Sequence, residues 1–178
     1  MMLTPKELAQ CTKARKAGIV NPIIAMQEAK LAALPYALLL SVLDQETGGG
    51  HNEWGHDPTI FVGGYDAKHN RHYPEQPVTE EAYKAYLVQR RSDGSGGMQG
   101  VGSMQLTWYA FQDRADKLGG CWKPQCNIRV GATDLAANIR RYGMHAGIAA
   151  YNGTGPNADR YAVEVLTRWK VWAWRVGG

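Results

Sequence analysis

The chain has 178 residues, of which 44% are hydrophobic and 20% are charged. This composition excludes a largely disordered protein, and the length favours a single domain over residues 1–178. The formal net charge of +4 favours polyanionic surroundings such as a cell wall or nucleic acid, without choosing between them. No run of lysine and arginine is typical of a nucleic-acid interface, so we expect no nucleic-acid partner. The longest apolar run, residues 31–43, is too short to cross a bilayer, so we expect no membrane insertion.

The amino terminus predicts synthesis in the cytoplasm without a signal peptide, because it lacks the basic start and the apolar centre of a secretory signal. The cysteine count agrees, because three cysteines leave at least one unpaired and suit a reducing compartment. Cys121 and Cys126 are close enough in sequence to form a small bridge, but free buried thiols are the favoured interpretation.

Two helices are predicted within residues 1–34. Thr4 is a helix N-cap followed by Pro5 at the first helical position, and this helix should end near residue 16. Asn21 and Pro22 repeat the start signal, and the second helix should end before Pro35.

Residues 35–50 predict a third, largely buried helix that ends on a glutamate. Its apolar positions and Glu46 share one face, since Tyr36, Leu39, Val42, Leu43 and Glu46 lie three or four residues apart. A carboxyl on that face loses hydration and lies at the negative end of the helix dipole, and both effects raise its pKa. Gly48, Gly49 and Gly50 end the helix and leave open space beside the carboxyl. The alternative is an ordinary exposed glutamate at the helix end.

The remainder of the chain predicts a mostly α fold with no internal repeat. Residues 51–78 lack helical or strand periodicity and predict a long irregular loop, with a short hairpin around residues 60–65. A glycine-rich stretch at residues 93–102 is expected to be a flexible connection. Further helices are expected over residues 79–92, within 103–120, and over 127–142, 145–151 and 158–174.

Four motifs occur in a fixed order over residues 35–174. They are the helix that ends in Glu46 and Thr47, GVGSMQL at residues 100–106, NIRVG at 127–131, and AYNG at 150–153 followed by Tyr161. Together they resemble the lysozyme-like superfamily of soluble lytic transglycosylases and goose-type lysozymes. The segments ETGGG, EWGHDPT and GVGSMQLTW also resemble the peptidoglycan-cleaving domain of actinobacterial phage lysins.

The resemblance implies a lysozyme-like helical domain in which Glu46 protonates the glycosidic oxygen between N-acetylmuramic acid and N-acetylglucosamine. It implies a sugar-binding groove formed by Thr47, Ser103, Met104, Gln105, Tyr151, Asn152 and Tyr161. It also implies a phage endolysin that acts at the bacterial cell wall on peptidoglycan glycan strands. Such an enzyme is expected to be a monomer without a cofactor. A longer parent chain with a wall-binding domain is left open. From the residues themselves, we expect the Tyr151 hydroxyl to reach the catalytic carboxyl and the Gln105 amide to bond sugar groups.

The second carboxylate of an ordinary glycosidase is the weakest part of the pattern. Asp57 is the best candidate, because goose-type enzymes carry an aspartate in a similar loop, whereas the aspartate that follows Met-Gln in those enzymes is replaced here by Leu106 and Thr107. This difference favours a lytic transglycosylase that forms 1,6-anhydromuramoyl ends over a hydrolytic muramidase. The family often has serine where this chain has Thr47, and it usually has leucine where this chain has Ser103.

Two other functions fit single features of the sequence. A metal-dependent peptidoglycan peptidase or amidase would use His51, His56, Asp57, Asp66, His69 and His72, although no HExxH motif is present, and we expect no metal site. A non-catalytic carbohydrate-binding module would stack sugars on exposed tryptophans. The later pair, Trp169 and Trp172, fits the core face of a helix, which leaves Trp54, Trp108 and Trp122 for a groove.

Overall fold

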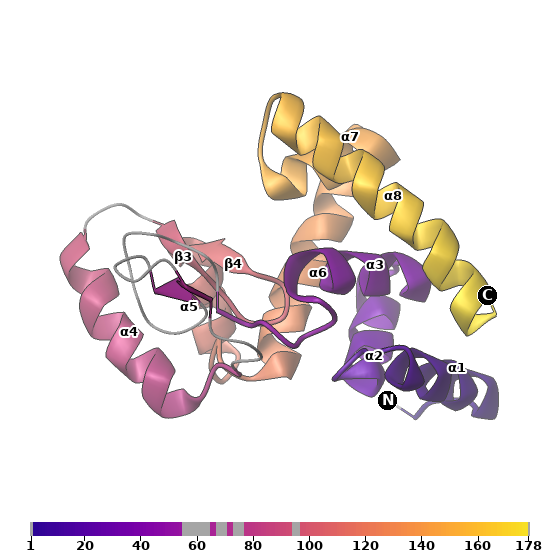
Figure 1. The fold of residues 1–178 in the computed structure, drawn as a ribbon, viewed down its shortest axis with the longest axis horizontal. Helices are drawn as coiled ribbons and strands as arrows, with labels where there is room; N and C mark the ends of the chain where they lie inside the picture. The colour runs from indigo at the N-terminus through magenta and orange to yellow at the C-terminus, as the bar shows by residue number, and fades with distance from the viewer. Residues whose placement is uncertain (1, 55–64, 67–70, 73–76, 94–96, 178) are drawn as a thin grey trace.

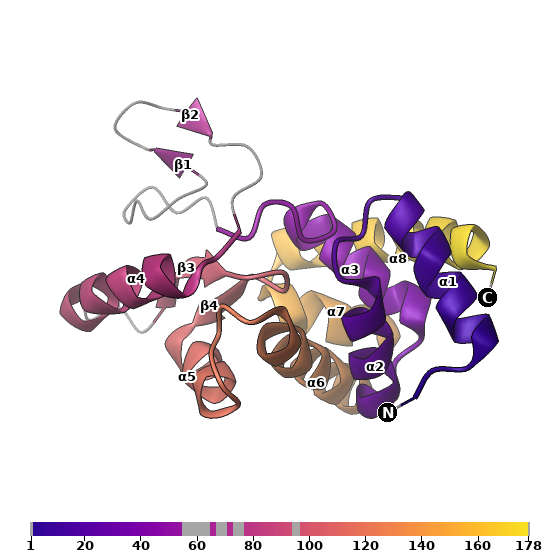
Figure 2. The same cartoon turned by 90° about the horizontal axis from the view of Figure 1, so that it is seen from below.

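The computed structural model describes residues 2–54, 65–66, 71–72, 77–93 and 97–177. The expectation of a mostly α fold is confirmed, and Figures 1 and 2 show how the helices are arranged. The helices are α1 (Pro5–Lys16), α2 (Pro22–Ala32), α3 (Tyr36–Thr47), α4 (Glu80–Asp93), α5 (Tyr109–Lys117), α6 (Pro124–Tyr142), α7 (Met144–Asn152) and α8 (Pro156–Val176).

The first helices begin where local signals predict them. Thr4 and Glu7 form a capping box at the start of α1, with each side chain bonded to the other residue's backbone N–H. Proline at the first helical position begins α2, as expected from Asn21 and Pro22. The third helix ends at Thr47, and Gly48 caps it in the left-handed conformation with φ 61°.

The glycine-rich connection differs from expectation. Strand β3 (Gly97–Val101) pairs antiparallel with β4 (Leu106–Trp108), so residues 97–101 form one strand of a hairpin rather than a flexible connection. The helix expected within residues 103–120 begins at Tyr109. A buried glutamine holds this hairpin, since the Gln112 amide donates to Gln99 O at 3.0 Å and to Leu106 O at 2.8 Å. These partners lie 13 and six residues before Gln112, and the composition of the glycine-rich stretch does not predict the contacts.

The short hairpin of the long loop is formed by β1 (Tyr65–Asp66) and β2 (Arg71–His72), which pair antiparallel. The predicted position was residues 60–65, of which 60–64 lie outside the described residues.

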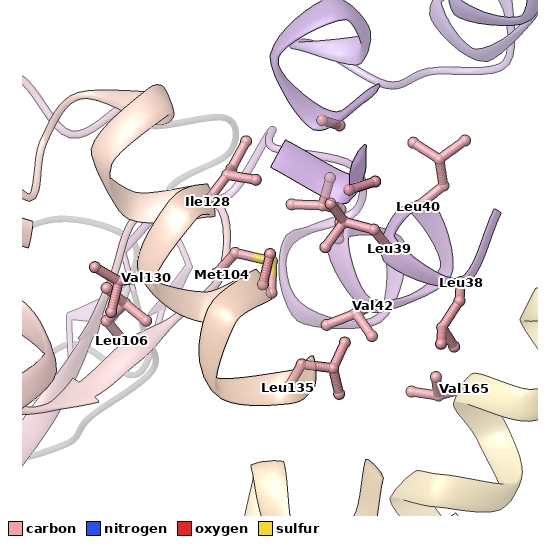
Figure 3. Close-up of a cluster of buried hydrophobic side chains, with 14 of the residues drawn as sticks. Leu38, Leu39, Leu40, Val42, Met104, Leu106, Ile128, Val130, Leu135 and Val165 are labelled. Carbon is pink, nitrogen blue, oxygen red and sulfur yellow. The ribbon is translucent and has the colours of Figure 1, made fainter. Parts of the chain in front are cut away.

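The core gathers around α6, which packs against α2, α5 and α7, while α3 packs against α8. Figure 3 shows Leu39 and Val42 of α3 on the side of Met104 and Leu135, and Leu38 on the side of Val165 of α8. Trp172 is buried and Trp169 is partly buried, as their spacing predicts. Cys11, Cys121 and Cys126 are buried free thiols, so the structure contains no Cys121–Cys126 bridge. None of the helices in the described part of the chain combines the length and the hydrophobicity needed to cross a lipid bilayer.

Candidate active site

Glu46 lies in the last turn of α3 and contacts the face of α8. Its side chain is partly exposed, and the Tyr161 hydroxyl donates a hydrogen bond to Oε1 at 2.5 Å. Burial raises the pKa of Glu46 to about 7, while the Tyr161 hydrogen bond acts in the opposite direction because it stabilises the carboxylate. A carboxyl with this pKa exchanges its proton near neutral pH and can act as both acid and base.

Three consecutive residues at the end of α3 fix its position against α8. Asp44 accepts from Arg168 at 3.0 Å and from the Trp172 indole at 3.2 Å, and Gln45 bonds Arg168 at 2.6 Å. With the Tyr161 contact to Glu46, these bonds hold successive turns of α8 against the end of α3. The carboxyl of Glu46 is therefore positioned by two helices rather than by one.

The turn at residues 102–105 is fixed to the other side of the same helix end. The Thr47 hydroxyl lies 3.0 Å from Ser103 O and 3.1 Å from Leu43 O, and it accepts from Gly50 N at 3.0 Å. Thr47 thus connects α3 directly to the Gly-Ser-Met-Gln turn. All of these Thr47 contacts are buried or partly buried.

Asn127, the first residue of the NIRVG motif, holds the turn at residues 102–105 through two hydrogen bonds of its side chain. Its amide donates to Val101 O at 2.8 Å and its oxygen accepts from Met104 N at 2.9 Å. Gly102 has φ 76°, and a Cβ there would lie 2.3 Å from the Asn127 amide nitrogen. The glycine is therefore required both by its backbone conformation and by the close approach of Asn127.

The two tyrosines of the motifs have different partners. We expected the Tyr151 hydroxyl to reach the catalytic carboxyl, but it donates to Met104 O at 2.7 Å, and Tyr161 is the residue that bonds Glu46. The pKa of each tyrosine is raised well above its usual value, by burial first and then by the charge of Glu46. Both hydroxyls therefore stay protonated and remain donors at neutral pH.

Four residues predicted to line a groove are buried instead. Thr47, Ser103, Met104 and Tyr161 have exposed fractions of 3%, 1%, 0% and 8%. Buried side chains cannot form the surface of a groove in this conformation, so we replace their predicted groove-lining role by a supporting one. Thr47, Ser103 and Met104 shape the turn beside Glu46, and Tyr161 donates to its carboxyl.

Gln105 and Asn152 retain some exposure. The Gln105 amide donates to Glu53 O at 3.1 Å and to Gly102 O at 3.0 Å, so its donors are used within the protein rather than facing a sugar. Its φ of 46° is unusual for a residue other than glycine, and such strained conformations cluster at functional sites. Asn152 is exposed at the end of α7.

Glu53 belongs to this contact network and was not predicted from the sequence. Its carboxylate accepts from the Ser103 hydroxyl at 2.6 Å and from Val78 N at 3.1 Å, and its carbonyl accepts from Gly102 N at 2.7 Å. Burial raises the pKa of Glu53, and the Ser103 and Val78 hydrogen bonds oppose this. In the sequence, Glu53 is the first residue of the EWGHDPT segment, seven residues after Glu46, but the loop has no periodicity from which a role could be assigned.

The predicted second carboxylate, Asp57, lies outside the described residues. Of the proposed metal ligands, His56 and His69 also lie outside them, and only backbone is described for Asp66 and His72. His51 is exposed, with its Nε2 2.9 Å from Gly18 O. Within the described part of the chain, no group of three or more His, Cys, Asp or Glu side chains is arranged to hold a metal ion.

The three tryptophans that the sequence left for a sugar-binding groove differ in their exposure. Trp54 is buried and Trp122 packs against Tyr83, with ring centroids 5.7 Å apart, whereas Trp108 is 63% exposed at the end of β4.

The site as a whole contains a partly exposed carboxyl, Glu46, with a pKa of about 7, a tyrosine that donates to that carboxyl, and a turn at residues 102–105 that hydrogen bonds hold beside it. Comparison with protein-family models, with curated proteins and with solved structures found no match to this chain.

Proposed function

We propose that this chain is a lysozyme-like lytic transglycosylase that cleaves the β-1,4 bond between N-acetylmuramic acid and N-acetylglucosamine in bacterial peptidoglycan. The observation that carries the proposal is the Glu46 carboxyl, whose pKa burial raises to about 7 and which remains partly exposed beside the motif-bearing turn. The order of the sequence motifs supports the substrate class. In this proposal the chain acts at the cell wall as a phage endolysin.

The proposed reaction uses Glu46 twice. The protonated carboxyl first donates its proton to the glycosidic oxygen, and the bond from that oxygen to C1 of N-acetylmuramic acid breaks. The carboxylate that remains then removes the proton from the C6 hydroxyl of the same sugar, whose oxygen forms the new bond to C1. Since Tyr161 donates to Oε1, we assign Oε2 to proton transfer. The proton returns to Glu46, so the enzyme ends unchanged.

The contacts of Glu53 argue against hydrolysis with Glu53 as the second carboxylate. A hydrolytic mechanism with two carboxylates needs a second group to activate water or to attack C1. Glu53 is buried, and its two oxygens accept hydrogen bonds from Ser103 and Val78. We therefore assign Glu53 a positioning role for the turn, and a hydrolytic mechanism would depend on Asp57.

The test is mass spectrometry of purified peptidoglycan after digestion. Muropeptides with 1,6-anhydromuramoyl ends would support transglycosylation, whereas reducing ends, heavier by one water, would show a muramidase. Glu46→Gln should abolish cleavage and leave wall binding intact, while Glu81→Gln, on the exposed first turn of α4, should cleave like the wild type.

Two outcomes would reject the proposed glycosidase. Cleavage by the Glu46→Gln variant that a chelator abolishes would instead indicate a metal-dependent peptidase or amidase. Wall binding by the wild type without any released fragment would indicate a carbohydrate-binding module.

A further inference from the structure

An apolar groove lies away from Glu46, between α1, the start of α3 and the second half of α8. Its volume is about 640 Å³. Leu166, Trp169 and Ala173 of α8 form one wall, and Pro35 and Tyr36 form the facing wall. Pockets of this size with mostly apolar walls are typical ligand-binding features.

The polar side chains of the groove are few. Gln10 of α1 and Lys170 of α8 line it, so an apolar interior is combined with a cationic group. An occupant that matches this chemistry has a hydrocarbon part and an anionic head.

The apolar surface continues from the groove onto the outer side of α8. Trp174 follows Lys170 by four residues and is therefore its neighbour on the helix surface. Its side chain is 81% exposed, and Val171 is also exposed. Tryptophan beside lysine on an exposed helix is typical of segments that lie in the headgroup region of a membrane.

Positive charge is concentrated at the same end of the molecule. Residues 5–16 and 166–178 contain seven of the chain's 20 lysine and arginine residues but one of its 16 acidic residues. Of these seven, Arg168 is ion-paired with Asp44 of α3. The two segments lie together, since a Cβ on Gly177 would be 2.9 Å from the Lys13 ammonium nitrogen and α1 packs against α8. Figure 1 shows the C-terminal end of α8 near α1. This charge is complementary to an anionic surface.

We propose that the groove and its basic rim, together called the α1–α8 face, bind the surface of a bilayer that contains anionic phospholipid. Acyl carbons occupy the groove between Tyr36 and Trp169, Lys170 contacts lipid phosphate, and Trp174 enters the headgroup region. The chain lies on the bilayer and does not cross it. This binding does not depend on the proposed cleavage of peptidoglycan.

The test is co-sedimentation of the purified chain with vesicles at 0.15 M salt. Vesicles of phosphatidylcholine with phosphatidylglycerol should bind the chain at least about tenfold more tightly than phosphatidylcholine alone, because each basic residue near an anionic surface contributes severalfold to affinity. Lipids with brominated acyl chains should quench tryptophan fluorescence in the wild type.

Two substitutions of exposed residues test the α1–α8 face without disturbing the core. Trp174→Ala and Lys170→Glu should each weaken vesicle binding about fivefold or more. The matched controls are Trp108→Ala, which removes the exposed tryptophan of β4, and Lys117→Glu, an exposed charge change at the end of α5. Both controls should bind vesicles like the wild type.

Several results would overturn the proposal. These are equal binding to neutral and anionic vesicles, an equal loss in both control variants, and wild-type vesicle binding by Trp174→Ala. Binding to heparin or DNA as tight as binding to vesicles would assign the basic residues to a soluble polyanion. Sedimentation of a stable dimer that Trp174→Ala dissociates would show that a second copy covers the groove.

Discussion

Replacing Tyr161 by phenylalanine tests whether Glu46 is the group whose protonation controls activity. The substitution keeps the ring in the core and removes the hydroxyl that donates to Glu46 Oε1. That hydrogen bond favours the charged carboxylate and lowers the pKa, so its loss should raise the pKa above the present value of about 7. Loss of a negatively charged neighbour would instead lower the pKa of Glu46.

The size of the shift follows from the strength of the bond. A hydrogen bond to a charged group contributes about 1.5–3 kcal/mol, and the lower value applies here because Glu46 is partly exposed. Since one pKa unit corresponds to about 1.4 kcal/mol, the pKa should rise by about one unit. The acid must be protonated to act, so the alkaline limb of kcat/KM should move upward by about one pH unit.

The assay is the rate of clearing of a cell-wall suspension between pH 5 and pH 9. Tyr151→Phe is the matched control, because its hydroxyl donates to Met104 O instead of to the carboxyl, and it should move the limb little. An unchanged limb in Tyr161→Phe, or a limb at lower pH, would refute the assignment of the titrating group to Glu46. A similar shift in both variants would show that the hydrogen bond is not its cause.

Three further predictions concern stability. Because burial raises the pKa of Glu46 from 4.5 to about 7, the folded chain binds this proton more tightly than the unfolded chain, and its stability falls as the pH rises from about 4.5 to about 7. Glu46→Gln should therefore raise the unfolding temperature, measured by calorimetry, at pH 8 but not at pH 4. Gly102→Ala places a Cβ against Asn127 at positive φ and should lose about 2 kcal/mol or more in urea unfolding, whereas Gly48→Ala, with open space around its Cβ, should lose about 1 kcal/mol. Arg129→Ala leaves the Glu28 carboxylate, 1% exposed, without its bidentate partner and should lose about 3 kcal/mol, and a loss below about 1 kcal/mol would contradict this.

The sequence predicted those parts of the fold that local signals determine. The start of α1 follows from Thr4 and Pro5, and the end of α3 follows from Gly48, because caps act through neighbouring residues. The β3–β4 hairpin was not predicted, because its glycine-rich strand depends on the buried amide of Gln112. Glycine content indicates which backbone conformations are accessible, but tertiary partners decide which one is adopted.

The candidate site was likewise predictable only where local sequence determines it. The position of Glu46 on an apolar helix face was readable from three- and four-residue spacing, and its raised pKa followed from that face. Which tyrosine contacts it was not readable, because the choice between Tyr151 and Tyr161 depends on how α7 and α8 pack against α3. Glu53 was missed because its partners, Ser103 and Val78, are distant in sequence.

The end of α3 explains why a carboxyl can be both half-buried and fixed at this place. Glu46 turns toward Tyr161 of α8, whereas Thr47, one position further around the helix, turns toward Ser103. The fixed position of this helix end is therefore not a property of α3 alone, since it uses two segments that lie 56 and 115 residues further along the chain. Burial of this group lowers stability at neutral pH, and the same burial keeps a proton on the carboxyl where the proposed reaction uses it. A glycan strand that covers Glu46 would remove its remaining water and hold that proton more firmly.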